Sequence, residues 1–130
     1  MAGSNSVNWF EIYVQDMARA RAFYESVFEI RLETLQAPDD PDAPGLEMLA
    51  FPGDMERYGA NGALCRMPGV ASGPGGTLVY FACEDCGVTA GRIAGAGGRV
   101  HRDKMAIGEY GFIVLAFDTE GNMIGLHSMR

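Results

Sequence analysis

The sequence predicts an α+β fold assembled from two successive copies of one βαβββ module. Three observations support this prediction. Residues 10–28 and 78–98 each combine an alternating apolar stretch, an acidic turn and a helical pattern. Shifting one copy by 69 positions places Asp16 on Asp85 and Ile12 on Phe81. Each copy is then followed by short apolar runs bounded by glycine, proline and aspartate, as is typical of strands joined by turns.

Chain length limits the organisation to one domain, because 130 residues cannot hold a separate cofactor domain and substrate domain. We expect a single domain over 1–130, with an N-terminal module over about 7–67, a linker over 68–76 and a C-terminal module over about 77–130. The linker is predicted from its glycine and small residues, which carry neither periodicity nor a large apolar group.

Composition indicates which partners to expect. The longest unbroken apolar run, 112–117, has six residues where a membrane span needs about 20, so no membrane partner is expected. A net charge of −7 with scattered basic residues disfavours nucleic acid. The first residues lack the basic start and apolar centre of a signal peptide, and an odd total of three cysteines is typical of a reducing compartment. We therefore expect a cytoplasmic protein.

In the N-terminal module, residues 7–14 alternate and predict a strand with Phe10 and Ile12 on one face and Trp9 and Glu11 on the other. Asp16 is a typical N-cap for a helix over 17–28, whose apolar residues recur at helical spacing and can cover the Phe10 face. Three further strands are predicted at 30–36, 46–51 and 63–67, with an exposed proline-rich loop over 37–45.

The C-terminal module follows the same order. A strand is predicted over 77–83, and a helix over 86–96 in which Gly91 and Gly95 each cost about 1 kcal/mol relative to alanine. The remaining strands are expected at 99–102, 111–117 and 122–128, with a turn from Asp118 to Asn122 between the last two.

In the order and wording of these motifs, the chain resembles the glyoxalase, bleomycin-resistance and extradiol-dioxygenase superfamily, also called the vicinal oxygen chelate superfamily. The matching segments are FEIYVQDMARARAFYESVF from residue 10, LVYFACED from residue 78 with GAGGRV after it, and FDTEGNMIGLHS at 117–128. The resemblance implies that the modules form a curled, cup-like eight-stranded mixed sheet with the helices on its outer face. It also implies a small-molecule ligand inside the cup and a homodimer.

Metal-dependent members of that superfamily bind a divalent ion through one side chain on the first strand and one on the last strand of each module. By this resemblance, the four positions fall here at Trp9, at Thr77 or Leu78, at 62–64 and at Gly125. None offers a group that coordinates a divalent cation well, so we expect no metal and no other cofactor. The alternative is a shifted metal site made by Glu11 and His127, each two positions beyond one of these.

Two aromatic residues are predicted to contact a ligand. Trp9 and Tyr80 lie on the strand faces that the helices leave free, and aromatic faces suit flat or apolar molecules. Tyr80 is the repeat counterpart of Glu11. The alternative is that both rings only fill space or cover a subunit interface.

Glu11 and His127 are the predicted catalytic residues, and both are also expected to bind the ligand. A carboxylate between Trp9 and Tyr13 suits a proton-transfer base, and a histidine suits an acid or base near neutral pH. The alternatives are a Glu11 that is solvated or paired with Arg66, and a His127 that is neutral and hydrogen-bonded. Charged residues in the connection after residue 102, Lys104 and Glu109, are further candidates for the rim of the cup.

Three classes of function follow. First is a metal-independent cup that binds a small organic molecule, as a sequestering protein of the resistance type or as a lyase or isomerase similar to lactoylglutathione lyase. Second is a metal-dependent glyoxalase-like lyase or dioxygenase with a shifted site. Third is a thiol redox module built on Cys83 and Cys86, although Glu84 and Asp85 between them disfavour a thiolate.

Overall fold

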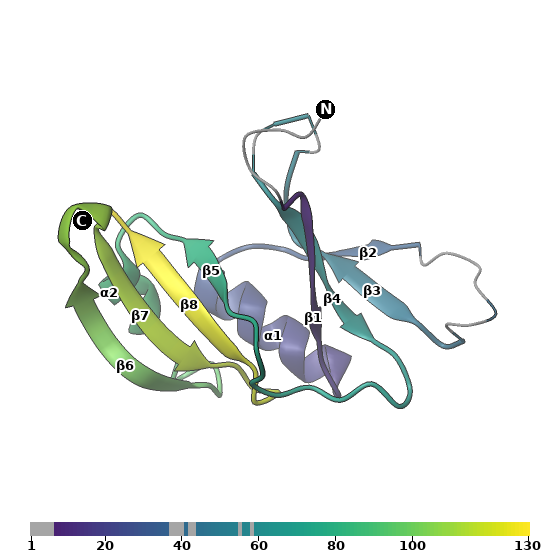
Figure 1. The fold of residues 1–130 in the computed structure, drawn as a ribbon. Helices are drawn as coiled ribbons and strands as arrows, with labels where there is room; N and C mark the ends of the chain where they lie inside the picture. The colour runs from purple at the N-terminus through teal and green to yellow at the C-terminus, as the bar shows by residue number, and fades with distance from the viewer. Residues whose placement is uncertain (1–6, 37–40, 42–43, 55, 58) are drawn as a thin grey trace.

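A computed structural model describes residues 7–36, 41, 44–54, 56–57 and 59–130, and its ribbon shows two modules side by side (Figure 1). The N-terminal module contains β1 (Trp9–Tyr13), α1 (Met17–Phe28), β2 (Glu33–Leu35), β3 (Glu47–Ala50) and β4 (Asn61–Arg66). The C-terminal module contains β5 (Val79–Ala82), α2 (Cys86–Ala90), β6 (Arg99–Ala106), the short 3₁₀ helix η1 (Gly108–Tyr110), β7 (Phe112–Phe117) and β8 (Met123–Ser128). Most of the predicted loop over 37–45 lies outside the described residues.

Both modules form a four-stranded mixed sheet with the same topology. The strand orders are β1-β4-β3-β2 and β5-β8-β7-β6, and in each sheet the first strand is parallel to the last while the other pairs are antiparallel. Repeat counterparts also occupy equivalent places in the two sheets. Glu11 lies opposite Ala63 of the last strand in one module, and its counterpart Tyr80 lies opposite Gly125 of the last strand in the other. The predicted α+β fold of two βαβββ modules is therefore confirmed, with its eight strands divided between two sheets.

Helix α1 begins and ends where the local chemistry predicts. The Asp16 carboxylate accepts a hydrogen bond from the Arg19 amide at 3.0 Å and so caps the first turn. Glu29 ends the helix in a left-handed conformation, with φ of 54°. The buried residues of α1 recur three and four apart, so the helix presents one apolar face to the sheets.

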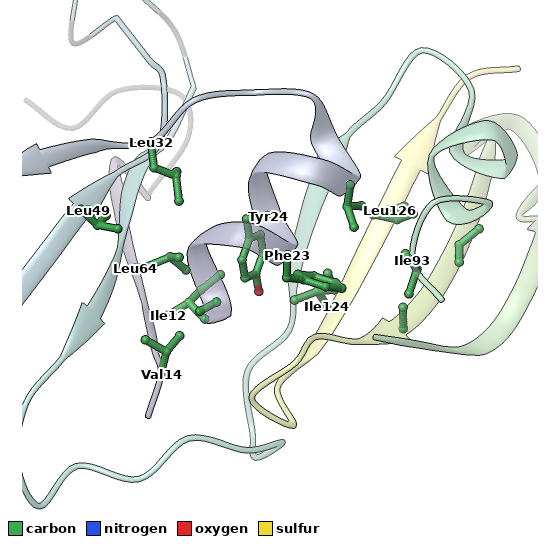
Figure 2. Close-up of a cluster of buried hydrophobic side chains, with 14 of the residues drawn as sticks. Ile12, Val14, Phe23, Tyr24, Leu32, Leu49, Leu64, Ile93, Ile124 and Leu126 are labelled. Carbon is green, nitrogen blue, oxygen red and sulfur yellow. The ribbon is translucent and has the colours of Figure 1, made fainter. Parts of the chain in front are cut away.

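One hydrophobic core joins the two modules (Figure 2). Phe23 and Tyr24 of α1 are fully buried there, together with Leu64 of β4 and Leu126 of β8. Phe81 of β5 contributes an aromatic contact from the C-terminal module, because its ring centroid lies 4.5 Å from that of Phe28 and 6.2 Å from that of Phe10. The helix side of both sheets is thus a shared core, which leaves the opposite faces free.

Two element boundaries in the C-terminal module differ from the prediction. Helix α2 ends at Ala90, and residues 91–97 form turns, because Gly91 at its C-terminus costs helical stability that so short a helix does not recover. Strand β6 continues to Ala106, so Lys104 lies in a strand, where its Nζ pairs with Asp85 Oδ1 at 2.9 Å. Lys104 was predicted at the rim of the cup, and its ion pair instead ties β6 to the cap of α2.

The turn from Asp118 to Asn122 is built into the junction of the modules rather than exposed. Its Asp118 carboxylate accepts hydrogen bonds from the Glu120 and Asn122 amides, both at 2.8 Å, as an Asx turn does. The same carboxylate also accepts the Tyr24 hydroxyl of α1 at 2.7 Å. Asn122 Nδ2 donates to the Tyr13 carbonyl at 2.9 Å, so the turn contacts both β1 and α1.

Glu120 is the most strongly held carboxylate at this junction, and its side chain is 0% exposed. It accepts the amides of Gln15 and Asp16, both at 2.9 Å, and Arg19 Nε at 2.7 Å. Burial alone would raise the pKa of Glu120, but these donors lower it to about 2. Ser72 of the predicted linker also donates to the Glu120 carbonyl at 2.8 Å, so the linker is bound to the turn.

Candidate functional site

The two sheets share an open side, which we define as the faces opposite to α1 and α2 (Figure 1). Phe10, Ile12 and Phe81 belong to or pack against the core on the helix side. Because successive residues of a strand point to opposite faces, their neighbours Glu11 and Tyr80 lie on the open side, as the sequence predicted.

Three residues of β1 form a hydrogen-bonded group on this side. Trp9 Nε1 donates to Glu11 Oε2 at 3.2 Å, and the Tyr13 hydroxyl donates to Glu11 Oε1 at 2.8 Å. The bond to Glu11, then burial and the carboxylate charge, raise the pKa of Tyr13 to about 12, so Tyr13 stays a neutral donor at physiological pH. Each carboxylate oxygen is therefore oriented by one neutral aromatic donor.

Arg66 takes no part in this group, so the alternative in which Glu11 pairs with Arg66 is wrong. Arg66 Nη1 lies 3.4 Å from Glu47 Oε2, and its Nε donates to the Gln15 carbonyl at 3.0 Å. These contacts fix Arg66 towards β3 and the end of β1. The strand register explains this choice, because Arg66 lies directly opposite Glu47 and shares the parity of Leu64, whereas Glu11 lies opposite Ala63 and so points to the other face.

A small apolar cluster supports the Glu11 group from neighbouring strands. Met48, Ala63 and Cys65 are buried there, and the Trp9 and Tyr13 rings pack against them. Burial, followed by the nearby Glu11 charge, raises the pKa of the Cys65 thiol to about 12. Cys65 therefore acts as a small apolar residue under the group, not as a nucleophile.

In the C-terminal module, the Tyr80 ring lies over Gly125. A Cβ at Gly125 would overlap the Cδ1 and Cε1 atoms of that ring, so only glycine fits there without displacing it. The ring is 46% exposed, which is unusual for so large an apolar surface in a strand. Tyr80 thus covers Gly125, the position that the sequence resemblance assigned to a metal ligand on the last strand.

His127 lies next to Tyr80 along the same face, opposite Ala82 in the register of β5 and β8. Its Nε2 is 2.6 Å from the Tyr110 carbonyl oxygen. A carbonyl only accepts, so Nε2 carries the proton, and a neutral ring then has Nδ1 as its acceptor. His127 is therefore hydrogen-bonded, as the more conservative interpretation of the sequence expected.

Three hollows open around these residues. The first, of about 530 Å³, is lined by Tyr80, Ala82, Ile107, Tyr110, Ile113 and His127. The second, also of about 530 Å³, lies between the modules and shares Tyr80 and Ala82 with the first, adding Phe10, Phe51 and Phe81 among others. The third, of about 230 Å³, is lined by Glu11 and Tyr13 of β1 and by the starts of β5 and β8.

The side chains at the family's metal positions do not fit a divalent ion. The chain has Trp9, Thr77 or Leu78, residues 62–64 and Gly125 at the positions that the resemblance assigns to metal ligands, and none of them has a carboxylate, imidazole or thiolate to offer. Glu11 and His127, the alternative pair, line different hollows. Within the described ranges of the chain, no group of three or more His, Cys, Asp and Glu side chains is placed to hold a metal.

The CxxC pair also lacks the setting of a reactive dithiol. Both thiols are free, and Cys86 is fully buried at the start of α2. Burial raises the pKa of Cys83, whereas a redox-active cysteine needs a lowered one.

Four residues were predicted for the site, and the structure brings two of them, Tyr80 and His127, into one hollow. Trp9 and Glu11 are joined by a hydrogen bond on β1. Tyr13 was considered only as a neighbour of Glu11. It stands two residues after Glu11 on β1, so strand alternation already placed it on the same face as Glu11. Tyr110 was missed, because no local pattern shows that η1 places it beside β8.

None of the helices in the described part of the chain is long and apolar enough to cross a membrane.

Comparisons with known proteins agree with this architecture. A glyoxalase-related enzyme from Fulvimarina pelagi superposes with a TM-score of 0.65 at 16% identity, covering 94% of this chain and 86% of that one. A glyoxalase/bleomycin resistance protein/dioxygenase family enzyme from Burkholderia phytofirmans PsJN gives 0.63 at 13% identity, covering 95% and 98%. Glyoxalase I from Zea mays gives 0.66 at 20% identity, where this chain spans only 45% of the maize chain.

At such identities these similarities show the fold alone. No curated protein sequence matches the chain. The family model described as Glyoxalase/Bleomycin resistance protein/Dioxygenase superfamily matches residues 6–126, which is nearly the whole chain. The protein therefore belongs to the Glyoxalase/Bleomycin resistance protein/Dioxygenase superfamily.

Proposed function

We propose that this protein binds a small, flat organic molecule, without a divalent metal, in the two hollows around Tyr80. One lies on the open side, and the other lies between the modules and reaches the core rings Phe10, Phe51 and Phe81. The observation that carries the proposal is the Tyr80 ring itself. It is half exposed, it lies over Gly125, and it lines both hollows of about 530 Å³. An aromatic face kept partly free between two apolar hollows is a natural stacking surface for a planar ligand.

The first hollow supports this proposal by its chemistry. Small-molecule sites typically measure about 300–1,000 Å³ and combine an apolar lining with a few polar groups. Here Ile107 and Ile113 supply apolar walls, while His127 supplies the polar group. Tyr110 adds a second aromatic ring that is 68% exposed. A ligand with an aromatic ring and one hydrogen-bond donor, directed at the free nitrogen of His127, fits this combination.

Binding is tested by a thermal-shift screen of small aromatic compounds, followed by titration of the best one. Tyr80→Ala should weaken its binding by about tenfold or more, because a stacking surface is lost. Tyr80→Phe should bind within about twofold of the wild type, since it keeps the ring. Val88→Ala is the matched control, because Val88 is 61% exposed but lies on α2. Equal binding by Tyr80→Ala and Val88→Ala would contradict the proposal.

Metal independence is tested on the purified protein by elemental analysis and by repeating the titration with a chelator. We expect the affinity to be unchanged. A stoichiometric Ni, Zn, Mn or Fe ion that the chelator removes together with binding would favour the metal-dependent alternative instead.

Sequestration and catalysis differ in the fate of the bound molecule. A sequestering protein returns its ligand unchanged, whereas a metal-independent lyase or isomerase converts it. We propose that His127 and Glu11 would carry any proton transfer, because they are the titratable side chains that line the open-side hollows. Incubation followed by NMR of the ligand separates the two cases, with His127→Ala and Glu11→Gln as the inactive variants expected for an enzyme.

The thiol alternative makes a separate prediction. A redox module requires fast alkylation of Cys83 or Cys86 by iodoacetamide near neutral pH. Burial of Cys86 and the raised pKa of the partly buried Cys83 support slow labelling, and mass spectrometry of the alkylated peptides measures it.

We also propose that the protein is a cytoplasmic homodimer. Strands β2 and β6 are the outer edges of their sheets, and a partner that covers such an edge protects its backbone groups from unwanted pairing. Light scattering after size exclusion should give twice the chain mass of 14.0 kDa, and a monomer would exclude this state. Imaging of a tagged protein in cells tests the location.

A further inference from the structure

Glu11 is held in a manner that favours a cationic partner. Its carboxylate accepts from Trp9 Nε1 at 3.2 Å and from the Tyr13 hydroxyl at 2.8 Å. Both donors are neutral, so they fix the orientation of the carboxylate without cancelling its charge. A carboxylate has about four lone-pair directions, and two of them are still free for a further donor.

Positive side chains are engaged elsewhere. Arg66, the basic residue nearest in the strand register, lies against Glu47. In the part of the chain that the structure describes, no Lys, Arg or His makes an ion pair with Glu11. The chain as a whole carries a net charge of −7, which raises the local concentration of cations around it.

The carboxylate opens onto a hollow of its own. This third hollow, of about 230 Å³, is lined by Glu11, Tyr13 and Thr77, together with the apolar side chains of Val79 and Met123. Its size suits a small head group rather than a large ring system. A carboxylate with an aromatic residue in the same hollow is a combination that suits organic ammonium ions, since the carboxylate supplies the opposite charge and an aromatic ring attracts a cation. Tyr13 is the aromatic residue that lines this hollow.

We propose that this hollow is a binding site for a small organic ammonium group, with Glu11 as its counter-ion and the Tyr13 ring in its wall. Trp9 does not line the hollow, but it is hydrogen-bonded to Glu11 and so lies next to the bound charge. The site is separate from the hollows around Tyr80, and it does not require them to bind anything. It assigns to the N-terminal module a recognition role for positive charge, in addition to the apolar recognition proposed for the C-terminal module.

Trp9 is the only tryptophan of the chain, so its fluorescence reports on this site without a label. The probes are benzyltrimethylammonium as the cation, benzyl alcohol as the neutral analogue and phenylacetate as the anion. In the wild type, the cation should bind about fivefold or more tightly than the neutral probe, and the anion more weakly still. Added salt should weaken binding of the cation and leave the neutral probe unchanged.

Glu11→Gln is the decisive variant, because it keeps an oxygen acceptor for one aromatic donor and removes only the charge. It should reduce the preference for the cation to within about twofold. Glu33→Gln, an exposed carboxylate on β2, is the matched control for loss of one negative charge, and it should keep the preference. Circular dichroism and the melting temperature confirm that each variant folds.

Three results would overturn the inference: equal affinity for cation and neutral probe in the wild type, a preference that persists in Glu11→Gln, or no response of Trp9 to the cation at its highest soluble concentration. None of these touches the proposed function, which is decided by Tyr80→Ala and its own ligand. Conversely, loss of the Tyr80 site would leave the response of Trp9 to the cation intact.

Discussion

The two modules have one backbone plan but use it differently. In each, the first and last strands are parallel, and a glycine of the last strand lies against an aromatic ring of the first. In the N-terminal module the ring is Phe10 over Gly62, on the helix side. In the C-terminal module the ring is Tyr80 over Gly125, on the open side. In β5 the aromatic residue stands one position later than in β1, and because successive residues of a strand point to opposite faces, its ring lies on the open side instead of in the core.

This difference determines what each half of the open side offers. With Phe10 in the core, β1 presents the polar Trp9–Glu11–Tyr13 group. With Tyr80 outside, β5 presents an apolar surface. A duplicated backbone has thus produced one charged hollow and two apolar ones, which is how a single scaffold can serve different ligands.

The turn from Asp118 to Asn122 ties the C-terminal module to the N-terminal one, and Glu120→Ala should weaken that connection most severely. The substitution removes the charged acceptor of the Gln15 and Asp16 amides, whose bonds to Glu120 are partly buried, at a cost of about 2–3 kcal/mol in the free energy of unfolding. Urea denaturation measures the loss. Glu33→Ala, on an exposed edge strand, should change stability by less than about 0.5 kcal/mol. Similar small changes in both variants would show that the turn does not hold the modules together.

Acid should weaken the same junction, with a smaller effect. The folded pKa of Glu120 is about 2, against an ordinary value of 4.5. Because the folded pKa is lowered, the stability is fully present above about pH 4.5 and is lost as the pH falls towards 2. We expect a loss of about 2 kcal/mol in this window.

Glu120→Gln is the control for this acid effect, since Glu25 and Asp85 also have lowered pKa values and contribute to the pH dependence of both proteins. The difference between wild type and variant isolates Glu120. Parallel stability curves between pH 4.5 and 2 would contradict the prediction.

Alanine substitutions at the two glycines test directly how tightly each aromatic ring is confined. Gly62→Ala forces a methyl group into the Phe10 ring inside the core and should cost about 1.5 kcal/mol. Gly125→Ala meets the Tyr80 ring, which is half exposed and can turn into solvent, so the cost should be about 0.5 kcal/mol. Thermal and urea denaturation rank the pair. Adding Tyr80→Ala should abolish the cost of Gly125→Ala, and equal costs for both glycines would mean that the two rings are equally confined.

Two tyrosine hydroxyls, one at the junction and one on the open side, give a further comparison that includes the smallest expected effect. Tyr24→Phe removes a buried hydrogen bond to Asp118 across the junction and should cost about 1 kcal/mol. Tyr13→Phe removes an exposed bond to Glu11 and should cost about 0.3 kcal/mol or less. Urea denaturation with several replicates resolves the two, and a reversed order would indicate that the open-side group, not the junction, stabilises the fold.

Much of the architecture was predictable because it depends on neighbours in the chain. Strand alternation assigned Phe10 and Glu11 to opposite faces, and the Asp16 cap located the start of α1. The end of α2 was not predictable in the same way. Gly91 and Gly95 weaken a helix by about 1 kcal/mol each, and tertiary packing decides whether that is enough to end it.

By itself, the sequence determined the duplicated plan and the faces of the strands, since both depend on residue type and local spacing. Only the tertiary structure decided that Arg66 pairs with Glu47, that Tyr110 lies beside His127, and that Glu120 binds the start of α1. These contacts join residues distant in the chain, where local periodicity carries no information. They arise from the way in which two modules pack around one core.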